Sequence, residues 1–291
     1  MNEWFGFLQN TAARGLANQK RHDGDFLDEN NLLICGKCKE PRQKIKDFQY
    51  EEDGENKTFS LKVTCHCRCE RERDVENEKK ERARREQMVL DRLRKASLMD
   101  AQFKYATFDK FEVDSNNKRN YLWCKSYVDR FDEMMKKNQG LLLYGDVGTG
   151  KSFAAACIAN DLLSKKYPVI MTSFVKILSL IQSREMQDAE ILERMEKVDL
   201  VIFDDLGAER GTDYALEKVY QIVDGRCRQN LPMIFTTNLT KEAMETESDI
   251  RYSRIYDRIL GSCYPMEFKG SSWRRAKAGR RYTEMEKVLD G

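Results

Sequence analysis

Short apolar runs alternate with amphipathic stretches over the second part of the chain. Strands are predicted at residues 141–144, 168–171, 200–203, 232–235 and 264–268. Helices are predicted at residues 152–165, 174–183, 215–228 and 253–260. Because the first four runs carry no polar alternation, both faces of these strands should be buried, which is typical of a parallel sheet covered by helices. The pattern therefore predicts an α/β fold.

The first hundred residues have a different pattern. Residues 1–70 show weak periodicity, and residues 70–95 contain neither Gly nor Pro. In this second stretch acidic and basic residues alternate at helical spacing, which indicates an exposed helix with ion pairs between successive turns. We therefore predict an N-terminal module at 1–70, a charged helical linker at 71–100 and the α/β domain at 101–291.

Composition and charge remove several classes of protein. The chain has 291 residues, of which 34% are charged, and its net charge is only +2. A bulk polycation is therefore excluded, and any basic binding surface must be local. No apolar run approaches ~18 residues, and the first ten residues lack the pattern of a secretory signal. We expect a cytoplasmic protein with no membrane partner.

Residues 145–152 read GDVGTGKS and match the phosphate-loop pattern G-x-x-x-x-G-K-[ST] between a predicted strand and a predicted helix. Glycines let backbone N–H groups surround phosphates, and the helix N-terminus adds positive potential. Lys151 is expected to contact the β- and γ-phosphates, and Ser152 to ligate Mg²⁺. The residues expected to bind ATP in this loop are Gly145, Asp146, Val147, Gly148, Thr149, Gly150, Lys151 and Ser152.

Two acids and an amide follow later strands. Asp204 and Asp205 come directly after the apolar run 200–203, at the strand end where ligands bind in α/β sheets. Asp204 is expected to be an outer-shell Mg²⁺ ligand, and Asp205 to polarise an attacking water. Asn238 follows the run 232–235 and could orient that water, although Asn also favours turns.

Five motifs in this order resemble the AAA+ ATPases, and among them the DnaC/DnaI-type replicative helicase loaders, with IstB-type transposition ATPases as relatives. The motifs are GDVGTGKS at 145–152, IFDDLG at 202–207, FTTN at 235–238, SRIYDRI at 253–259 and SSWRRAKA at 271–278. The resemblance covers residues 100–291 and implies an AAA+ P-loop NTPase core with ATPase activity.

The resemblance also implies roles for single residues. Asp205 would be the catalytic acid, although many AAA+ proteins have Glu there, and Asn238 would be the sensor 1 residue. Arg258 would be the arginine finger that reaches a neighbouring subunit, with Arg254 on the same helical face. Arg274 would be the sensor 2 arginine. A finger supplied in trans implies that hydrolysis requires a homo-oligomer.

Clustered cysteines indicate a metal site in the N-terminal module. Cys35 and Cys38 form a C-x-x-C knuckle, and a second group follows at 65–69. Such groups fit a tetrahedral zinc site, which substitutes for a core in a small module. If 61–69 is a strand, its three cysteines share one face. The fourth ligand therefore stays open, and zinc is predicted on four of the five residues Cys35, Cys38, Cys65, Cys67 and Cys69.

The remaining cysteines, Cys124, Cys157, Cys227 and Cys263, are expected in the core. A zinc-binding segment ahead of the ATPase also resembles DnaI-type loaders, in which that region engages the helicase.

Two segments could bind single-stranded DNA. Residues 269–281 contain six basic side chains and no acid. Trp273 lies among them, and Tyr282 follows directly. Basic and aromatic residues together can follow a single strand by charge and stacking. Residues 174–184 form the second candidate, because related loaders and initiators use that region. An ordinary solvated surface is the alternative for both segments.

The combined prediction is an ATP-dependent loader of a replicative DNA helicase onto single-stranded DNA, with ATP, Mg²⁺ and Zn²⁺ as cofactors. One alternative is an IstB-like ATPase that assists a transposase, which would not require the cysteine module. The other is a small-molecule P-loop kinase, which would need a lid or an acceptor pocket that the sequence does not reveal.

Overall fold

The computed structural model describes residues 3–52, 55–209 and 211–290. The chain divides into two compact units, Met1–Glu86 and Gln87–Gly291. Helix α2 (Arg68–Ala96) runs from the first into the second and has no buried residue. It is the helix predicted at 70–95, and ion pairs such as Glu81–Arg85 at 3.1 Å join its successive turns. Among the described helices, none is both long and apolar enough to span a bilayer.

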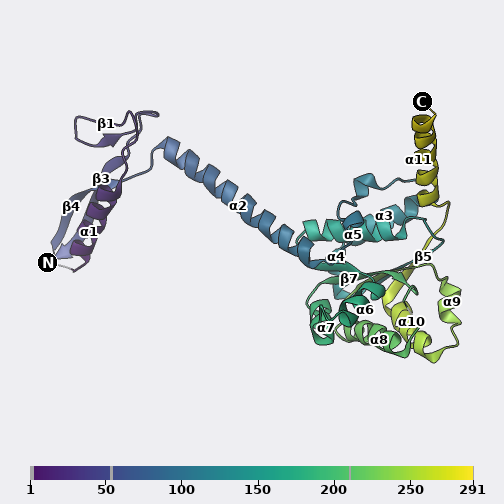
Figure 1. Cartoon of the computed structure of the whole chain (residues 1–291). Coiled ribbons are helices and arrows are strands. Elements are labelled where there is room, and N and C mark those ends of the chain that lie inside the picture. Colours follow the sequence, from purple (N-terminus) through teal and green to yellow (C-terminus); the bar gives the residue numbers. More distant parts are fainter. Residues whose placement is uncertain (1–2, 53–54, 210, 291) are drawn as a thin grey trace. The chain divides into compact units, whose positions relative to one another are not determined.

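The N-terminal unit is built from small antiparallel elements. Strands β1 (Phe26–Leu27) and β2 (Leu33–Ile34) pair with each other, and β3 (Gln43–Glu52) pairs with β4 (Glu55–Thr64) in a long hairpin. Helix α1 (Glu3–Asn18) lies beside this hairpin (Figure 1). The sequence pattern did not predict these elements, because so few of their side chains are buried that no clear periodicity results.

The second unit contains a five-stranded parallel sheet in the order β6-β7-β8-β5-β9. Its strands are β5 (Gly140–Gly145), β6 (Val169–Thr172), β7 (Leu200–Leu206), β8 (Met233–Thr237) and β9 (Cys263–Phe268). All five predicted strands are therefore present, and the predicted α/β fold with a parallel sheet is confirmed. The apolar runs of β5 to β8 are buried, as expected for a sheet covered on both faces.

Helices cover both faces of the sheet and form two apolar clusters. One face is covered by α3 (Lys118–Asp129), α4 (Phe131–Lys136) and α5 (Lys151–Ser164). The other is covered by α6 (Phe174–Gln182), α7 (Asp188–Glu196), α8 (Asp213–Arg228) and α10 (Ile250–Ser262), as Figure 1 shows. Helices α9 (Lys241–Glu245) and α11 (Trp273–Leu289) complete the unit. The four predicted helices are present as α5, α6, α8 and α10.

The strand order determines where the candidate site lies. Strand β8 is hydrogen-bonded to β5 on one side and to β7 on the other. Since these three strands are parallel, their carboxyl ends meet at one edge of the sheet. The phosphate loop after β5, the acids at the end of β7 and Asn238 after β8 therefore meet at that edge.

Of the four scattered cysteines, Cys124, Cys157 and Cys263 are buried and Cys227 is partly buried.

Candidate functional site

The phosphate loop lies between β5 and α5 and turns back sharply. Gly145 and Gly148 have φ values of 129° and 85°, in the left-handed region that glycine enters at little cost. Neighbouring atoms also exclude a side chain: a Cβ at Gly145 would lie 2.3 Å from the Phe268 carbonyl oxygen. A Cβ at Gly148 would lie 2.1 Å from the Ser272 hydroxyl oxygen. The loop is thus packed against the end of β9 and the residue before α11.

Lys151 begins α5 and is only 5% exposed. Its ammonium group donates hydrogen bonds to the carbonyl oxygens of Gly145 at 2.8 Å and Asp146 at 2.7 Å. A third bond goes to Oδ1 of Asn238 at 2.9 Å. Burial lowers the pKa of Lys151, and the nearby carboxylates of Asp205 and Asp146 oppose this effect. These bonds hold the cation at the head of the loop, where phosphate oxygens would accept its hydrogen bonds.

A bulge in β7 brings two consecutive acids to one pocket. In a regular strand, neighbouring side chains point to opposite faces of the sheet. Here the pairing of β7 with β8 shifts between Phe203 and Leu206, and Asp205 has a φ of 61°. As a result, both Asp204 and Asp205 line the same cavity. The sequence predicted the two acids but not the backbone distortion that places them together.

Hydrogen bonds join these acids to their neighbours. The Thr236 hydroxyl donates to Oδ1 of Asp204 at 2.7 Å, and the Asn238 amide donates to Oδ1 of Asp205 at 3.1 Å. Burial raises the pKa of Asp204, whereas hydrogen bonds from Thr236 and Ser152 act in the opposite direction. Lys151, Asn238 and the acid pair therefore form one connected polar network.

The cavity above this network has a volume of about 370 Å³. The predicted site residues that line it are Val147, Gly148, Gly150, Lys151, Ser152, Asp204, Asp205, Asn238 and Arg274. Thr149 lines the adjoining cavity instead, and its hydroxyl donates to the Asp146 carbonyl at 2.9 Å. The structure therefore brings together residues from the phosphate loop, β7, β8 and the start of α11.

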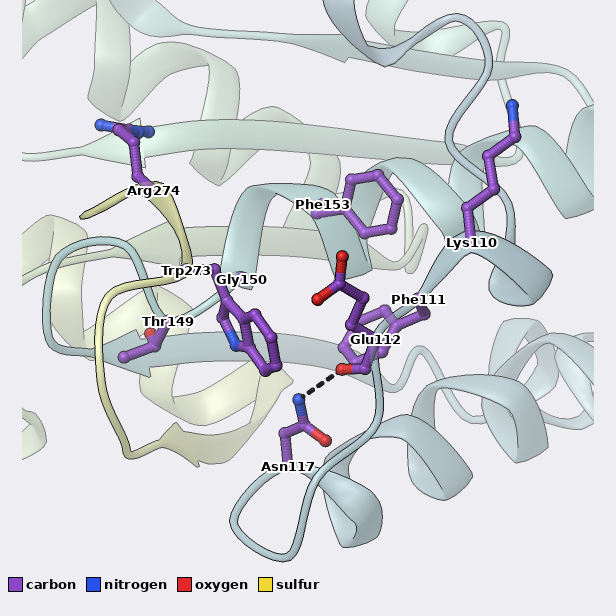
Figure 2. A pocket seen from close by; sticks show the side chains of 9 residues that line it. All are labelled: Lys110, Phe111, Glu112, Asn117, Thr149, Gly150, Phe153, Trp273 and Arg274. Carbon is purple, nitrogen blue, oxygen red and sulfur yellow. Dashed lines mark hydrogen bonds between the residues drawn. The ribbon is translucent and has the colours of Figure 1, made fainter. Parts of the chain in front are cut away.

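The adjoining cavity, also about 370 Å³, has aromatic walls (Figure 2). The rings of Phe111, Phe153 and Trp273 face this space from three segments of the chain. It shares Gly150 and Arg274, among others, with the phosphate cavity. An apolar space next to a phosphate cradle suits the base of a nucleotide. Neither Phe111 nor Phe153 belongs to a recognised motif, so sequence reasoning did not find them.

Arg258 lies away from these cavities. It is half-exposed on α10, and its Nε is 3.2 Å from Oδ1 of the buried Asp224 on α8. Asp224 is also paired with Arg228. The Arg254 guanidinium lies over the Tyr220 ring, 5.7 Å from its centroid. Arg258 therefore does not join the other predicted catalytic residues within one chain.

Four cysteines in the N-terminal unit converge. The sulfur atoms of Cys35, Cys38, Cys67 and Cys69 all lie within 4.8 Å of one another, whereas the Cys65 sulfur contacts the Pro41 carbonyl at 3.4 Å. Tetrahedral zinc with Zn–S bonds of ~2.3 Å places its sulfurs about 3.8 Å apart, so this donor set fits zinc. A hydrogen bond from the Cys69 amide is the main cause that lowers the pKa of Cys38 to about 6, which favours the ligating thiolate.

The strand considered at 61–69 is wrong. Strand β4 ends at Thr64, and α2 begins at Arg68. Cys67 is the last residue before this helix and Cys69 lies in its first turn. The alternation of a strand, which would place Cys65 on the same face as both, therefore does not apply. This change of backbone separates Cys65 from the other four.

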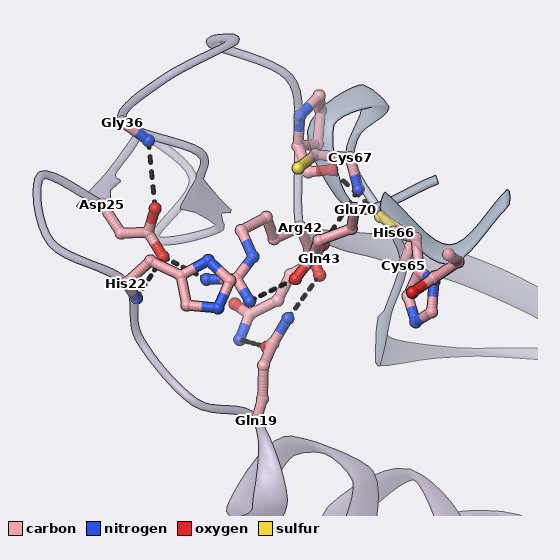
Figure 3. Close-up of polar contacts among 12 residues, drawn as sticks. Gln19, His22, Asp25, Gly36, Arg42, Gln43, Cys65, His66, Cys67 and Glu70 are labelled. Atoms are coloured by element: carbon pink, nitrogen blue, oxygen red, sulfur yellow. Dashed lines mark hydrogen bonds and ion pairs between the residues drawn. The ribbon is translucent and has the colours of Figure 1, made fainter. Parts of the chain in front are cut away.

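One buried guanidinium braces both halves of the cysteine cluster (Figure 3). Arg42 is 3% exposed and pairs with Asp25 on one side and with Glu70, at 2.6 Å, on the other. Asp25 accepts the Gly36 amide at 3.0 Å, within the first cysteine knuckle. Glu70 accepts the Cys67 amide at 3.1 Å. Nothing in the sequence motifs pointed to this arrangement.

The two candidate DNA-binding segments are both largely helical. Residues 273–281 belong to α11, and Lys269 pairs with Glu267 at 2.9 Å. The side chains of Lys277 and Arg280 lie outside the described residues. In the second segment, Lys176 of α6 donates to Oδ1 of Asp100 at 2.7 Å. Lys269 and Lys176 are therefore already paired with acids of the chain.

Fold and site together define a P-loop ATP-binding protein of the AAA+ type. The family profile described as "IstB-like ATP binding protein" matches residues 55–280, which is more than half of the chain. The chain therefore belongs to the IstB-like ATP-binding family, and an ATPase kind of activity follows from this membership.

Two relatives of the chain are replicative helicase loaders. The chain is 28% identical over 182 residues to the replicative helicase loader DnaC of Escherichia coli K12, covering 60% of this chain and 72% of the relative. It is 27% identical over 186 residues to the replicative helicase loader DnaI of Bacillus subtilis, covering 58% of each.

Solved structures show the same fold. A crystal structure of DnaI has a TM-score of 0.52 and 26% identity, covering 62% of this chain and 98% of that one. A crystal structure of the DnaC helicase loader has a TM-score of 0.51 and 20% identity, covering 58% of this chain and 100% of that one. The second similarity concerns the fold alone.

Proposed function

We propose that this protein is an ATP-dependent loader of a replicative DNA helicase onto single-stranded DNA. The observation that carries the proposal is the similarity to the helicase loader DnaC, which spans 182 residues and 72% of that protein. DnaI, a loader from a different bacterium, is similar at nearly the same level. The proposal places the protein in replication initiation and in the cytoplasm.

The nucleotide chemistry follows from the residues at the sheet edge. The loop 145–152 and Lys151 would bind the phosphates, and Ser152 and Asp204 would hold Mg²⁺, a cation that prefers such oxygen ligands. Asp205 would draw the proton from a water oriented by Asn238. The water oxygen would bond to the γ-phosphorus while the bond to the bridging oxygen breaks, giving ADP and phosphate.

Completion of the site would require a second subunit. Arg274 lines the phosphate cavity of its own chain, whereas Arg258 does not. We expect Arg258 to exchange its bond with Asp224 for the γ-phosphate of a neighbouring copy, so that assembly activates hydrolysis. Single-stranded DNA would bind the assembled ATPase, with residues 269–281 as one candidate surface.

The N-terminal unit would bind the helicase. The cysteine cluster and the Arg42 brace give this unit a fixed structure despite its small apolar core. A binding unit ahead of the ATPase fits a protein that holds a helicase at one end and responds to ATP at the other. This division of roles is part of the proposal.

Co-purification with the host or phage replicative helicase tests the proposal. We expect the intact chain to retain the helicase in the presence of ATP and a Cys67→Ser variant to lose it. A Cys65→Ser variant, altered outside the cluster, is the matched control. Failure of the intact chain to retain any helicase, with ATP, with ADP or without nucleotide, would contradict the loader function.

Assistance to a transposase is the second candidate function, and the IstB-like profile match favours it. It would use the same ATP site but a transposase as partner. ATP-dependent stimulation of strand transfer by a transposase, with no retention of helicase, would replace the loader proposal with this one.

A further inference from the structure

The Thr236 hydroxyl lies between the two acids that end β7. Thr236 is in β8 and is 1% exposed. Its oxygen accepts the backbone N–H of Asp205 at 2.8 Å and donates its proton to Oδ1 of Asp204 at 2.7 Å. A single buried side chain therefore contacts the backbone of one acid and the carboxylate of the other.

The direction of these bonds follows from their chemistry. A backbone N–H can only donate, so it must use a lone pair of the Thr236 oxygen. The hydroxyl proton is then directed to Asp204, where an ionised carboxylate gives the stronger, charge-assisted bond. This bond holds Oδ1 of Asp204 and so restrains the orientation of the carboxylate.

The same hydroxyl supports a costly backbone conformation. Asp205 has a φ of 61°, in the left-handed region that is unfavourable for a residue with a side chain. Its amide is held by Thr236, and the next residue is held by Thr237, whose hydroxyl donates to the Leu206 carbonyl at 2.8 Å. Two adjacent threonines of β8 therefore secure the bulge that brings both acids to the phosphate cavity.

We propose that Thr236 is a positioning residue that orients Asp204 and Asp205 together toward Mg²⁺–ATP. The inference rests on the proposed nucleotide function of this site. It adds a residue that lines the phosphate cavity and whose hydroxyl is bonded to both acids, so that it acts through the way the two acids are presented. Supporting groups of this kind typically change metal affinity or activity by ~10–100-fold when removed.

The test compares three variants with the wild-type chain. Thr236→Val removes the hydroxyl at nearly constant volume, and Thr236→Ser retains it. Thr172→Val is the matched control, because Thr172 is a buried threonine of the same sheet whose hydroxyl has no hydrogen-bond partner in the described structure. Titration of a fluorescent ATP analogue with and without Mg²⁺ reports binding, steady-state assays report turnover, and thermal melts report folding.

We expect Thr236→Val to raise the Mg²⁺ concentration needed for tight nucleotide binding about 10-fold and to lower kcat by ~10–100-fold. Nucleotide affinity without Mg²⁺ should change by less than about twofold, since the phosphate loop is untouched. Thr236→Ser should stay close to wild type, and so should Thr172→Val. If the valine variant does not fold, Thr236→Ala takes its place with the same expectation.

A folded Thr236→Val protein with wild-type Mg²⁺ dependence and turnover would overturn this inference but not the proposed nucleotide function. If Thr172→Val lowered Mg²⁺-dependent binding and kcat to the same extent, the inference would also be overturned, because the effect would then come from altering the sheet. A wild-type chain that binds no ATP with or without Mg²⁺ would instead overturn the proposed nucleotide function itself.

Discussion

The two units of this protein are stabilised by different means. In Gln87–Gly291, apolar side chains cover both faces of a five-stranded sheet. In Met1–Glu86, the described buried apolar or thiol side chains are only Leu33, Ile34, Cys35 and Cys67. Four clustered thiols and a buried ion-pair network take the place of a core there. We therefore expect the N-terminal unit to unfold when a few polar or metal-binding groups are lost, and the ATPase unit to stay folded after the same losses.

Loss of metal should give the largest effect. Removal of Zn²⁺ by a strong chelator is expected to unfold the N-terminal unit and leave the ATPase unit folded, because structural zinc supplies ~10–16 kcal/mol in small domains. Limited proteolysis should then degrade the N-terminal unit while ATP binding persists. Elemental analysis should give about one zinc per chain, and Cys67→Ser should lower this to near zero.

Cys65→Ser provides the control, since its sulfur lies outside the cluster. Wild-type protein purified anaerobically with almost no zinc would refute the metal site. Equal loss of zinc in both variants would show that the cluster is not limited to the four converging cysteines.

Breaking the buried ion-pair network should give the next largest effect. Arg42→Met keeps most of the side-chain volume but leaves Asp25 and Glu70 without their shared cation. Removal of one partner of a buried pair typically costs about 3–5 kcal/mol. Hydrogen exchange should therefore show faster opening in residues 25–70 and unchanged protection in the parallel sheet. If Arg42→Met changed the hydrogen-exchange protection of both units equally, the two units would not be stabilised by different means.

Arg42 also shows why only part of the molecule could be predicted. The phosphate loop and the acid pair were found in advance because their function requires particular residues at short spacing in the sequence. Arg42 acts through Asp25 and Glu70, which are distant in sequence and become neighbours only after folding. The β7 bulge and the aromatic cavity likewise depend on packing between separate segments. Motifs therefore revealed the chemistry, whereas its supporting contacts required the structure.

Lys151→Ala should affect the ATPase unit without disturbing the N-terminal unit. The variant removes a cation that makes three hydrogen bonds at the phosphate loop. Hydrogen bonds to charged groups contribute about 1.5–3 kcal/mol, so ATP affinity should fall by roughly 10–150-fold. Isothermal titration measures the affinity, and zinc content serves as the control for the other unit. Unchanged ATP affinity would remove Lys151 from the nucleotide site.

The smallest expected effect concerns Glu209, a buried acid shortly after β7 that the motifs did not indicate. It is 8% exposed, and its carboxylate accepts the Gly207 amide at 2.9 Å. Burial raises the pKa of Glu209, backbone hydrogen bonds partly oppose this, and the nearby Asp205 raises it further. Burial raises the pKa of Tyr256 on α10, and the charge of Glu209 raises it further.

A raised folded pKa means that the neutral acid is favoured in the folded state. Its contribution to stability is fully present below the ordinary pKa of 4.5 and is lost as pH rises through the folded value. Glu209→Gln keeps an oxygen for the Gly207 amide but never ionises. Because a rise in pH costs stability through this group only in the wild type, the variant should melt a few degrees (~2–4 °C) above wild type at pH 7, and the difference should shrink toward zero near pH 4. Melts at both pH values decide this, since a difference that is independent of pH would assign the effect to packing rather than to the buried charge.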